Sequence, residues 1–244
     1  MLTLYDIHSH ILPGIDDGCK TPEEAVLALE MAYRQGVRCL FATPHYYPVE
    51  SVECFLQRRQ EAWQQLSSYI GRENITDIPH IQLGAEVAYR PGISNEPRLQ
   101  ELCLGKSKHL LLELPFRPWG NDELRQVRNM VCTLGITPIL AHYERYRQIQ
   151  TKTMFETMRQ QNVQVQMNGE YLLDFLTRRR ARKWIAAGMV HHLGSDCHNL
   201  RERKPNLAEA AAYLQKHKQQ SSLFRLAENA RQIFEADKMD RGIL

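Results

Sequence analysis

Short β-rich runs alternate with longer helical patterns along the chain, and this alternation constrains the fold more than any other feature. Strands are predicted over residues 4–7, 38–42, 80–83, 109–112, 137–141, 163–167 and 189–193, and helices over about 22–35, 51–69, 96–103, 122–134, 152–161, 172–187 and 206–219. Such alternation is typical of a parallel sheet with helical crossovers. We therefore predict an α/β fold. Seven strands suggest closure into a barrel, and an open doubly wound sheet is the alternative.

The length and charge of the chain favour one soluble domain. Residues 1–244 fit a single domain, and 31 basic against 28 acidic residues give a net charge of +3, which does not demand a nucleic-acid partner. We expect no membrane insertion, because no run of about 18 apolar residues exists. We also expect no secretory signal, because the first residues lack a basic region followed by an apolar one. The six cysteines form no C-x-x-C pair. We therefore expect a cytoplasmic protein.

Potential metal ligands follow most of the predicted strands. They are His8 and His10 after the first strand, Asp17 in the next loop, His45 after the second, Glu86 after the third, Glu113 after the fourth, His142 after the fifth, and Asp196 and His198 after the seventh. The carboxyl ends of parallel barrel strands share one face, where active sites are built. We therefore expect these nine side chains to meet.

Their chemistry indicates a site for more than one cation. In His8-x-His10 both imidazoles lie on the same side of an extended segment and can reach one ion. Glu113 stands among leucines, where a carboxylate is costly unless it is neutralised. Nine ligands exceed the four of one zinc ion and suit two or three ions bridged by carboxylate. Nitrogen and oxygen ligands without thiolate favour manganese, iron or zinc over copper(I).

Five motifs carry a resemblance to a known family. The runs DIHSHILPGIDDG, ATPH, GAEV, ITPILAHYERY and GSDCHN are similar, in this order, to those of the bacterial PHP-domain protein-tyrosine phosphatases. The resemblance covers nearly the whole chain. It implies a distorted seven-stranded, TIM-like (β/α) barrel, the PHP fold, with three divalent ions, usually manganese.

The resemblance also implies how the nine ligands are shared. His8, His10, Glu86 and Asp196 would hold one ion; Asp17, His45 and His198 a second; and Glu86, Glu113 and His142 a third. Glu86 would then bridge two ions.

Two arginines near these motifs are candidates for substrate binding and catalysis. Arg145 lies three residues after His142, and Arg203 lies five after His198. A guanidinium group binds phosphate oxygens in a bidentate fork. The family has phosphate-binding arginines at these positions, although Arg201 competes with Arg203 for the second role.

The resemblance implies a metal-dependent hydrolysis of phosphotyrosine, in which metal-bound hydroxide attacks phosphorus and the arginines neutralise the phosphoryl oxygens. The expected partner is the phosphotyrosine-bearing C-terminal tail of a bacterial tyrosine kinase that controls capsule and exopolysaccharide synthesis. Three alternatives remain. They are a small-molecule phosphatase of the histidinol-phosphate kind, an amidohydrolase on the same barrel, and a non-catalytic phosphotyrosine-binding regulator.

Two further patterns compete with this interpretation. Cys197 and Arg203 have the C-x5-R spacing of cysteine-dependent tyrosine phosphatases, although no glycine lies between them to form a phosphate-binding loop. A basic run holds Arg178, Arg179, Arg180, Arg182 and Lys183. It is expected to form either a solvated helix face or a docking face for an acidic tail. Binding of nucleic acid is the third interpretation.

Overall fold

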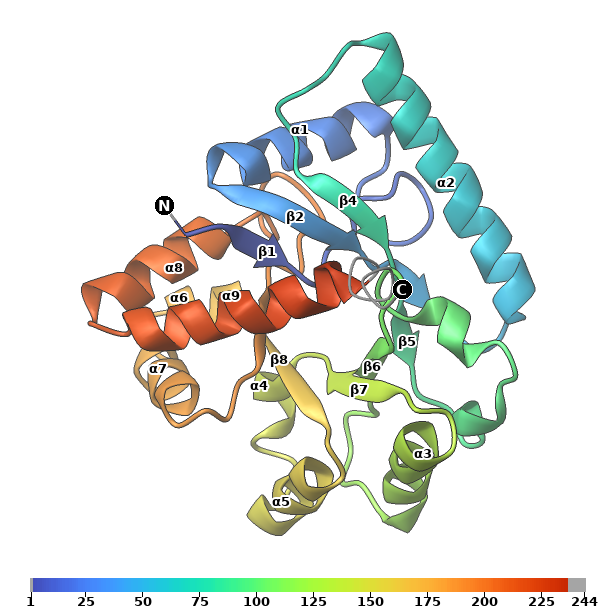
Figure 1. Ribbon diagram of the computed structural model, residues 1–244, viewed down its shortest axis with the longest axis vertical. Coiled ribbons are helices and arrows are strands. Elements are labelled where there is room, and N and C mark those ends of the chain that lie inside the picture. The colour runs from blue at the N-terminus through green and yellow to red at the C-terminus, as the bar shows by residue number, and fades with distance from the viewer. Residues whose placement is uncertain (1, 237–244) are drawn as a thin grey trace, which may run out of the picture.

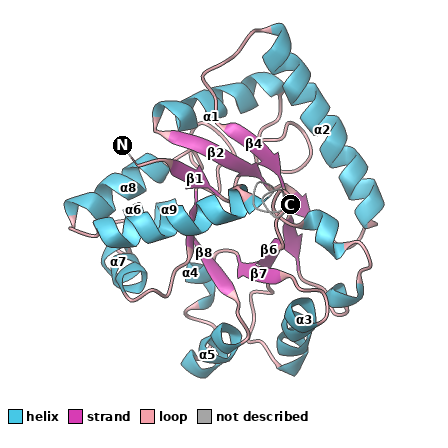
Figure 2. Ribbon diagram, in the orientation of Figure 1, coloured by secondary structure: helices cyan, strands magenta, loops and turns pink. Residues whose placement is uncertain are grey.

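The computed structural model describes residues 2–236 and has the predicted α/β architecture (Figures 1 and 2). Its strands are β1 (Leu4–Asp6), β2 (Val37–Ala42), β3 (His45–Tyr46), β4 (His80–Leu83), β5 (Glu86–Ala88), β6 (His109–Glu113), β7 (Thr137–Leu140), β8 (Gln164–Asn168) and β9 (His192–Gly194). Its α-helices are α1 (Pro22–Arg34), α2 (Val52–Arg72), α3 (Asn121–Cys132), α4 (Tyr143–Tyr146), α5 (Lys152–Gln160), α6 (Gly169–Leu173), α7 (Arg178–Ala186), α8 (Leu207–Lys216) and α9 (Gln220–Phe234). Two 3-10 helices, η1 (Ile93–Asn95) and η2 (Leu99–Leu102), precede β6.

The seven predicted strands are all present, together with two further short strands, β3 and β5, and the strands are arranged in two sheets. The strands form a three-stranded sheet, β1-β2-β4, and a six-stranded sheet, β3-β5-β6-β7-β8-β9, with parallel pairing throughout. Strands β3 and β5 were not predicted, because Pro44 and Gly84 interrupt the chain after β2 and β4. Proline lacks a donor for the ladder, so β2 ends before Pro44 and pairing resumes at His45 in the second sheet.

The two sheets are joined where the chain continues from one to the other. The Gly84 amide donates to Ala42 O at 2.8 Å, and the Glu86 amide donates to Pro44 O at 3.1 Å. On the opposite side, Ser9 and Cys197 form an isolated parallel bridge. The whole assembly is therefore curled, and the carboxyl ends of its strands face one centre.

The helices begin and end at recognisable signals. In α1, the Thr21 side chain accepts a hydrogen bond from the Glu24 amide, Pro22 occupies the first turn, and Gly36 follows the helix with φ of 91°. The predicted helix over 172–187 is divided into α6 and α7, because the Asp174 side chain accepts hydrogen bonds from the Leu176 and Thr177 amides. The predicted helix over 96–103 is the 3-10 helix η2, and α4 and α9 were not predicted.

The helices pack outside the strands and leave the strand ends free. Figure 1 shows α1 and α2 beside β2 and β4, and α3 and α5 beside β7 and β8. α9 packs against β1 and β9, and Phe234 at its end contacts Tyr5 of β1 and Phe41 of β2 edge-on. No helix within residues 2–236 is long and apolar enough to cross a bilayer.

Candidate metal centre

All nine predicted ligands lie in one cluster at the carboxyl ends of the strands. Four groups have ligand atoms within 4.8 Å of one another: His10, Asp17, His45 and His198; His8, His142 and Asp196; His8, His10 and Glu86; and Glu86, Glu113 and His142. The last matches one predicted set in full, and the predicted set of Asp17, His45 and His198 gains His10. The predicted set of His8, His10, Glu86 and Asp196 is also close, since the Oδ1 atom of Asp196 lies 3.5 Å from Nε2 of both His8 and His10.

Glu86 is the centre of this cluster. Its side chain is fully buried, and its carboxylate lies 3.1 Å from His8 Nε2, 3.3 Å from His10 Nε2, 3.1 Å from His45 Nδ1 and 2.8 Å from His142 Nε2. Burial raises the pKa of Glu86, but the surrounding imidazoles outweigh it and hold the pKa well below its usual value. Glu86 is therefore a permanent anion that faces ligands of all three predicted ion sites.

Hydrogen bonds orient four of the imidazoles with Nε2 toward the cluster. The Nδ1 atoms of these rings contact Gln166 Oε1 at 3.3 Å for His8, Asp16 Oδ2 at 2.7 Å for His10, Asn168 Oδ1 at 3.1 Å for His142, and the Asp196 carbonyl at 2.9 Å for His198. A second partner on Nδ1 fixes the tautomer and orientation of a metal-binding histidine. Sequence reasoning assigned no role to Gln166, Asn168 and Asp16. The alternation of Gln164, Gln166 and Asn168 with apolar residues along β8 was the available signal.

Asp16, rather than its neighbour Asp17, is the buried member of the aspartate pair. Its carboxylate also accepts the Gly18 amide at 2.9 Å and the His45 amide at 3.0 Å. Burial raises the pKa of Asp16, but these bonds and His10 lower it far below its usual value. The loop can pass this close to His10 because residue 18 is a glycine. A Cβ atom at this position would lie 2.1 Å from the His10 carbonyl oxygen.

Several buried ligand atoms lack a hydrogen-bond partner among the described residues. They are Nδ1 of His45, Nε2 of His198 and Oδ1 of Asp196. Buried polar atoms are costly when unpaired. Their convergence in one centre of imidazole nitrogens and carboxylate oxygens fits divalent cations.

Electrostatics differ among the histidines of the cluster. Burial lowers the pKa of His10, but the Asp16 and Glu86 carboxylates outweigh it and raise the pKa to about 10. Burial and the neighbouring His10 lower the pKa of His198 to about 4. Burial, with the nearby Glu86 carboxylate, raises the pKa of Glu113. The cluster thus contains groups that hold a proton at neutral pH, such as His10, and groups that do not, such as His198. Metal ligands must be unprotonated, so cations bound here would displace the protons.

Two arginines border the cluster on the solvent side. Arg203 Nη2 lies 2.6 Å from Asp196 Oδ2, and Arg145 Nη2 lies 3.6 Å from the same oxygen. The Asn199 side chain accepts the Arg201 and Arg203 amides and so shapes the loop. The guanidinium of Arg203 reaches the cluster, whereas that of Arg201 makes no contact with it among the described residues.

Cys197 does not belong to this cluster. Its side chain is buried with Ile11, Leu12 and Cys19, and burial raises the thiol pKa well above its usual value. A nucleophilic cysteine needs a lowered pKa. The C-x5-R spacing is therefore coincidental in this fold.

Comparison with known proteins identifies the family. Residues 4–235 match the family model described as "Capsular polysaccharide synthesis, CpsB/CapC". The chain belongs to the CpsB/CapC family. The tyrosine-protein phosphatase CpsB of Streptococcus agalactiae is 31% identical over 219 residues, which cover 85% of this chain and 88% of CpsB. The tyrosine-protein phosphatase YwqE of Bacillus subtilis is 28% identical over 93% of this chain and 90% of YwqE.

The fold of this CpsB/CapC member also matches a solved structure. The crystal structures described as YwqE from B. subtilis and CpsB from Streptococcus pneumoniae, "unique metal-dependent tyrosine phosphatases", include a chain that superposes with a TM-score of 0.82. That chain is 25% identical, and the match covers 94% of both chains.

Proposed function

We propose that this protein is a metal-dependent protein-tyrosine phosphatase that acts in capsular or exopolysaccharide synthesis. The observation that carries the proposal is the convergence of nine metal-type ligands beside two guanidinium groups, in a member of a family whose similar relatives are tyrosine-protein phosphatases. A pure binding module has no need of so many buried ligands. The paired arginines favour a phosphate ester over the amide substrate of an amidohydrolase.

We further propose that the cluster binds three divalent ions, with manganese as the most suitable. The overlapping groups support this number, because Glu86, His8, His10 and His142 each belong to two of them. Ions held there would activate water and neutralise phosphoryl charge. The ligand assignments are those predicted for His8, His10, Asp17, His45, Glu86, Glu113, His142, Asp196 and His198.

The arginines are proposed to hold the phosphoryl group. Arg145 and Arg203 approach the same Asp196 oxygen, so their guanidinium groups are already gathered beside the ligand cluster. Their side chains are 42% and 33% exposed, so an incoming phosphate can reach both. Fixed positive groups that meet developing negative charge stabilise a phosphoryl-transfer transition state.

Two aromatic side chains at the entrance suit a phenyl ring. Tyr47 is 49% exposed and stacks on His45 at 5.2 Å, and Phe116 is 50% exposed with the Arg145 guanidinium 5.8 Å from its ring. Sequence reasoning gave neither a role. They favour an aryl phosphate such as phosphotyrosine over histidinol phosphate.

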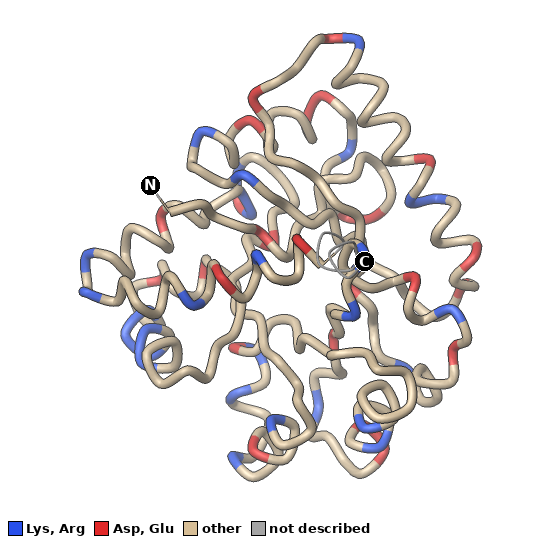
Figure 3. The backbone as a smooth tube through the Cα atoms, viewed as in Figure 1, with Lys and Arg blue, Asp and Glu red and all other residues tan. Residues whose placement is uncertain are grey.

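The substrate is proposed to be a phosphotyrosine-rich tail of a bacterial tyrosine kinase. The basic run lies on α7, and Figure 3 shows Lys and Arg gathered there. Such a face is complementary to an acidic segment.

We also propose that the two sheets are parts of one distorted seven-stranded barrel in a single domain over 1–244, because β2 leads into β3, β4 leads into β5, and the Ser9–Cys197 bridge joins the outer strands.

The decisive experiment is hydrolysis of a phosphotyrosine peptide by the purified protein. We expect chelation to abolish turnover, manganese to restore it, and Cys197→Ser to retain near wild-type activity. Loss of activity in Cys197→Ser with little effect of chelation would establish the thiolate mechanism instead. Hydrolysis of small phosphomonoesters without hydrolysis of the peptide would keep the metal site and overturn the protein substrate.

A further inference from the structure

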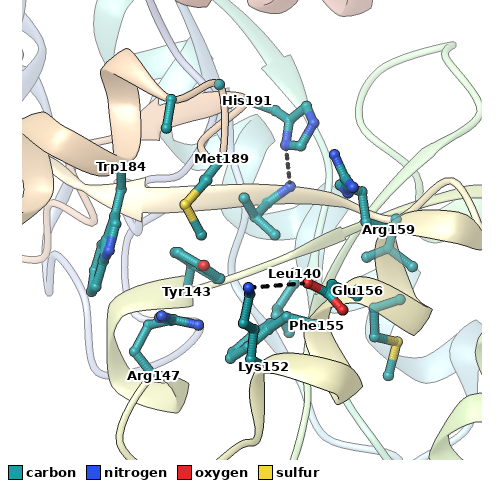
Figure 4. A pocket seen from close by; sticks show the side chains of 15 residues that line it. Leu140, Tyr143, Arg147, Lys152, Phe155, Glu156, Arg159, Trp184, Met189 and His191 are labelled. Carbon is teal, nitrogen blue, oxygen red and sulfur yellow. Dashed lines mark hydrogen bonds and ion pairs between the residues drawn. The ribbon is translucent and has the colours of Figure 1, made fainter.

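A cavity separate from the metal-ligand cluster lies between α5, the end of α7 and strand β8. Its volume is about 390 Å³, and none of the nine candidate ligands lines it. Its walls include Leu140, Val165, Trp184 and Met189 (Figure 4). This volume and apolar lining are typical of small-molecule sites.

The polar groups of the cavity are mostly cationic. Arg147, Lys152 and Arg159 line it together with one carboxylate, Glu156, which lies 3.7 Å from the Lys152 ammonium. The second and third positive charges have no such counter-ion: within residues 2–236 the Arg159 side chain makes no hydrogen bond or ion pair, and the Arg147 side chain makes no ion pair. The cavity therefore has an excess of positive charge over an apolar floor.

Arg147 is held in place by aromatic rings rather than by carboxylates. Its guanidinium carbon lies 5.8 Å from the ring centroid of Tyr143, 5.1 Å from that of Phe155 and 5.3 Å from that of Trp184. Its Nε atom is buried and has no hydrogen-bond partner among the described residues. A buried donor without an acceptor calls for an anionic or hydrogen-bonding ligand.

A neutral donor completes the lining. The Nδ1 atom of His191 accepts the Val165 amide at 3.1 Å, as the dashed line in Figure 4 marks, so the ring proton lies on Nε2. Burial, with Arg225 and Arg159, lowers the pKa of His191 and keeps the ring uncharged. Of the cavity's polar side chains, only Glu156 would repel an anion.

We propose that this cavity binds a small aromatic anion. Its flat ring system would lie against Trp184 and Met189, and its acidic group would lie between Arg147 and Arg159. The ring contacts supply affinity through apolar burial and stacking, and the guanidinium groups select for the negative charge. This inference is independent of the proposed phosphatase activity.

The test compares two dyes that share an aromatic body and differ in charge. 8-Anilinonaphthalene-1-sulfonate is anionic, and N-phenyl-1-naphthylamine is its uncharged counterpart. In fluorescence titrations of the wild-type protein, we expect the sulfonate to bind at least about tenfold more tightly than the uncharged dye. One hydrogen bond to a charged group contributes a factor of about this size. Equal binding of the two dyes would overturn the anion assignment.

Variants locate the bound dye. Arg159→Gln should weaken sulfonate binding about tenfold and leave the uncharged dye unaffected. Arg128→Gln is the matched control, because Arg128 is exposed on α3 and does not line the cavity. Ala187→Phe should abolish sulfonate binding by filling the cavity from its exposed rim, and its circular dichroism and melting temperature verify the fold.

Two outcomes would overturn the proposal. The first is sulfonate binding that survives both Arg159→Gln and Ala187→Phe, which would place the dye elsewhere, such as on the exposed Phe175 and Leu176. The second is displacement of the dye by a phosphotyrosine peptide but not by free naphthalene-2-sulfonate. That result would assign the cavity to a polypeptide partner instead of a small molecule.

Discussion

The two ends of the parallel strands bury histidines in opposite electrostatic surroundings. At the carboxyl ends, carboxylates raise the pKa of His10 to about 10 and also raise that of His142 despite burial. At the amino ends, burial lowers the pKa of His109 to about 4 and that of His192 well below its usual value, and neither has an acidic partner within residues 2–236. Removal from water thus accompanies a ligand cluster at one end and neutral imidazoles at the other, where His192 is buried and His109 is partly buried. The neighbouring carboxylates make the difference.

Removal of the central carboxylate should have the largest effect on activity. Glu86→Gln should lower kcat/KM for a phosphotyrosine peptide by on the order of 10³-fold, because it removes the anion shared by two ligand groups. Manganese titration followed by elemental analysis should show fewer bound ions. His109→Gln at the other end is the control and should keep near wild-type activity at pH 7.5. Equal losses in both variants would mean that the two ends do not differ in function.

Replacement of a rim arginine should have the next largest effect. Arg145→Lys keeps the charge but removes the fork that binds two phosphoryl oxygens, so kcat/KM should fall by about 10²-fold. Arg201→Lys is the matched control. Arg201 lies two residues before Arg203, but its guanidinium makes no contact with the cluster among the described residues. A fall of similar size in Arg201→Lys would show that the second phosphate-binding role belongs to Arg201.

The amino-end histidines predict a stability change with pH. In the folded state His109 takes up a proton only near pH 4, whereas in the unfolded chain it does so near its ordinary value of 6.5. Acid therefore stabilises the unfolded state first. The unfolding equilibrium constant should rise by up to about tenfold per pH unit as the pH falls from 6.5 toward 4. Urea unfolding at pH 7.5, 6.5, 5.5 and 4.5 should show this fall in wild type and a shallower one in His109→Gln. Parallel curves would contradict the lowered pKa.

The smallest expected effect concerns the entrance. Tyr47→Ala should raise KM for a phosphotyrosine peptide several-fold, on the order of one aromatic contact, with little change in kcat. Phe224→Ala, an exposed aromatic on α9, is the control. A change in kcat without a change in KM would instead mean that Tyr47 acts through the stacked His45 ring.

Strand positions and ligands could be predicted because each depends on local sequence. The β-rich runs are bounded by turn residues, and the family motifs place His8 and His142 two residues after β1 and β7, and His45 three residues after β2. The second sheet could not be predicted in this way, because β3 and β5 consist of two and three residues and exist only through pairing with each other and with β6. Local preference does not specify such short strands.

The supporting hydrogen bonds were equally hidden from the sequence. Gln166 serves two sites at once, since its Oε1 atom accepts from the His142 amide at 3.0 Å and contacts His8 Nδ1 at 3.3 Å. These partners are 24 and 158 positions away. Contacts at such separations follow from the fold and not from any pattern within β8. The choice of Asp16 over Asp17 as the buried carboxylate depends likewise on how the loop closes over His10.

The backbone contact between the first and last ligand segments has a consequence for biosynthesis. The Asp196 amide donates to His8 O at 2.8 Å, the His10 amide donates to Cys197 O at 2.8 Å, and the Ser195 amide donates to Asp6 Oδ1 at 2.9 Å. A ribosome adding about 5–20 residues per second leaves the His-x-His segment without these partners for roughly ten seconds or more. The nascent chain therefore carries the His8 and His10 side chains without those of Asp196 and His198 through most of its translation. Under the proposed ligand assignment, the complete set of side chains can bind cations only after these distant segments have met.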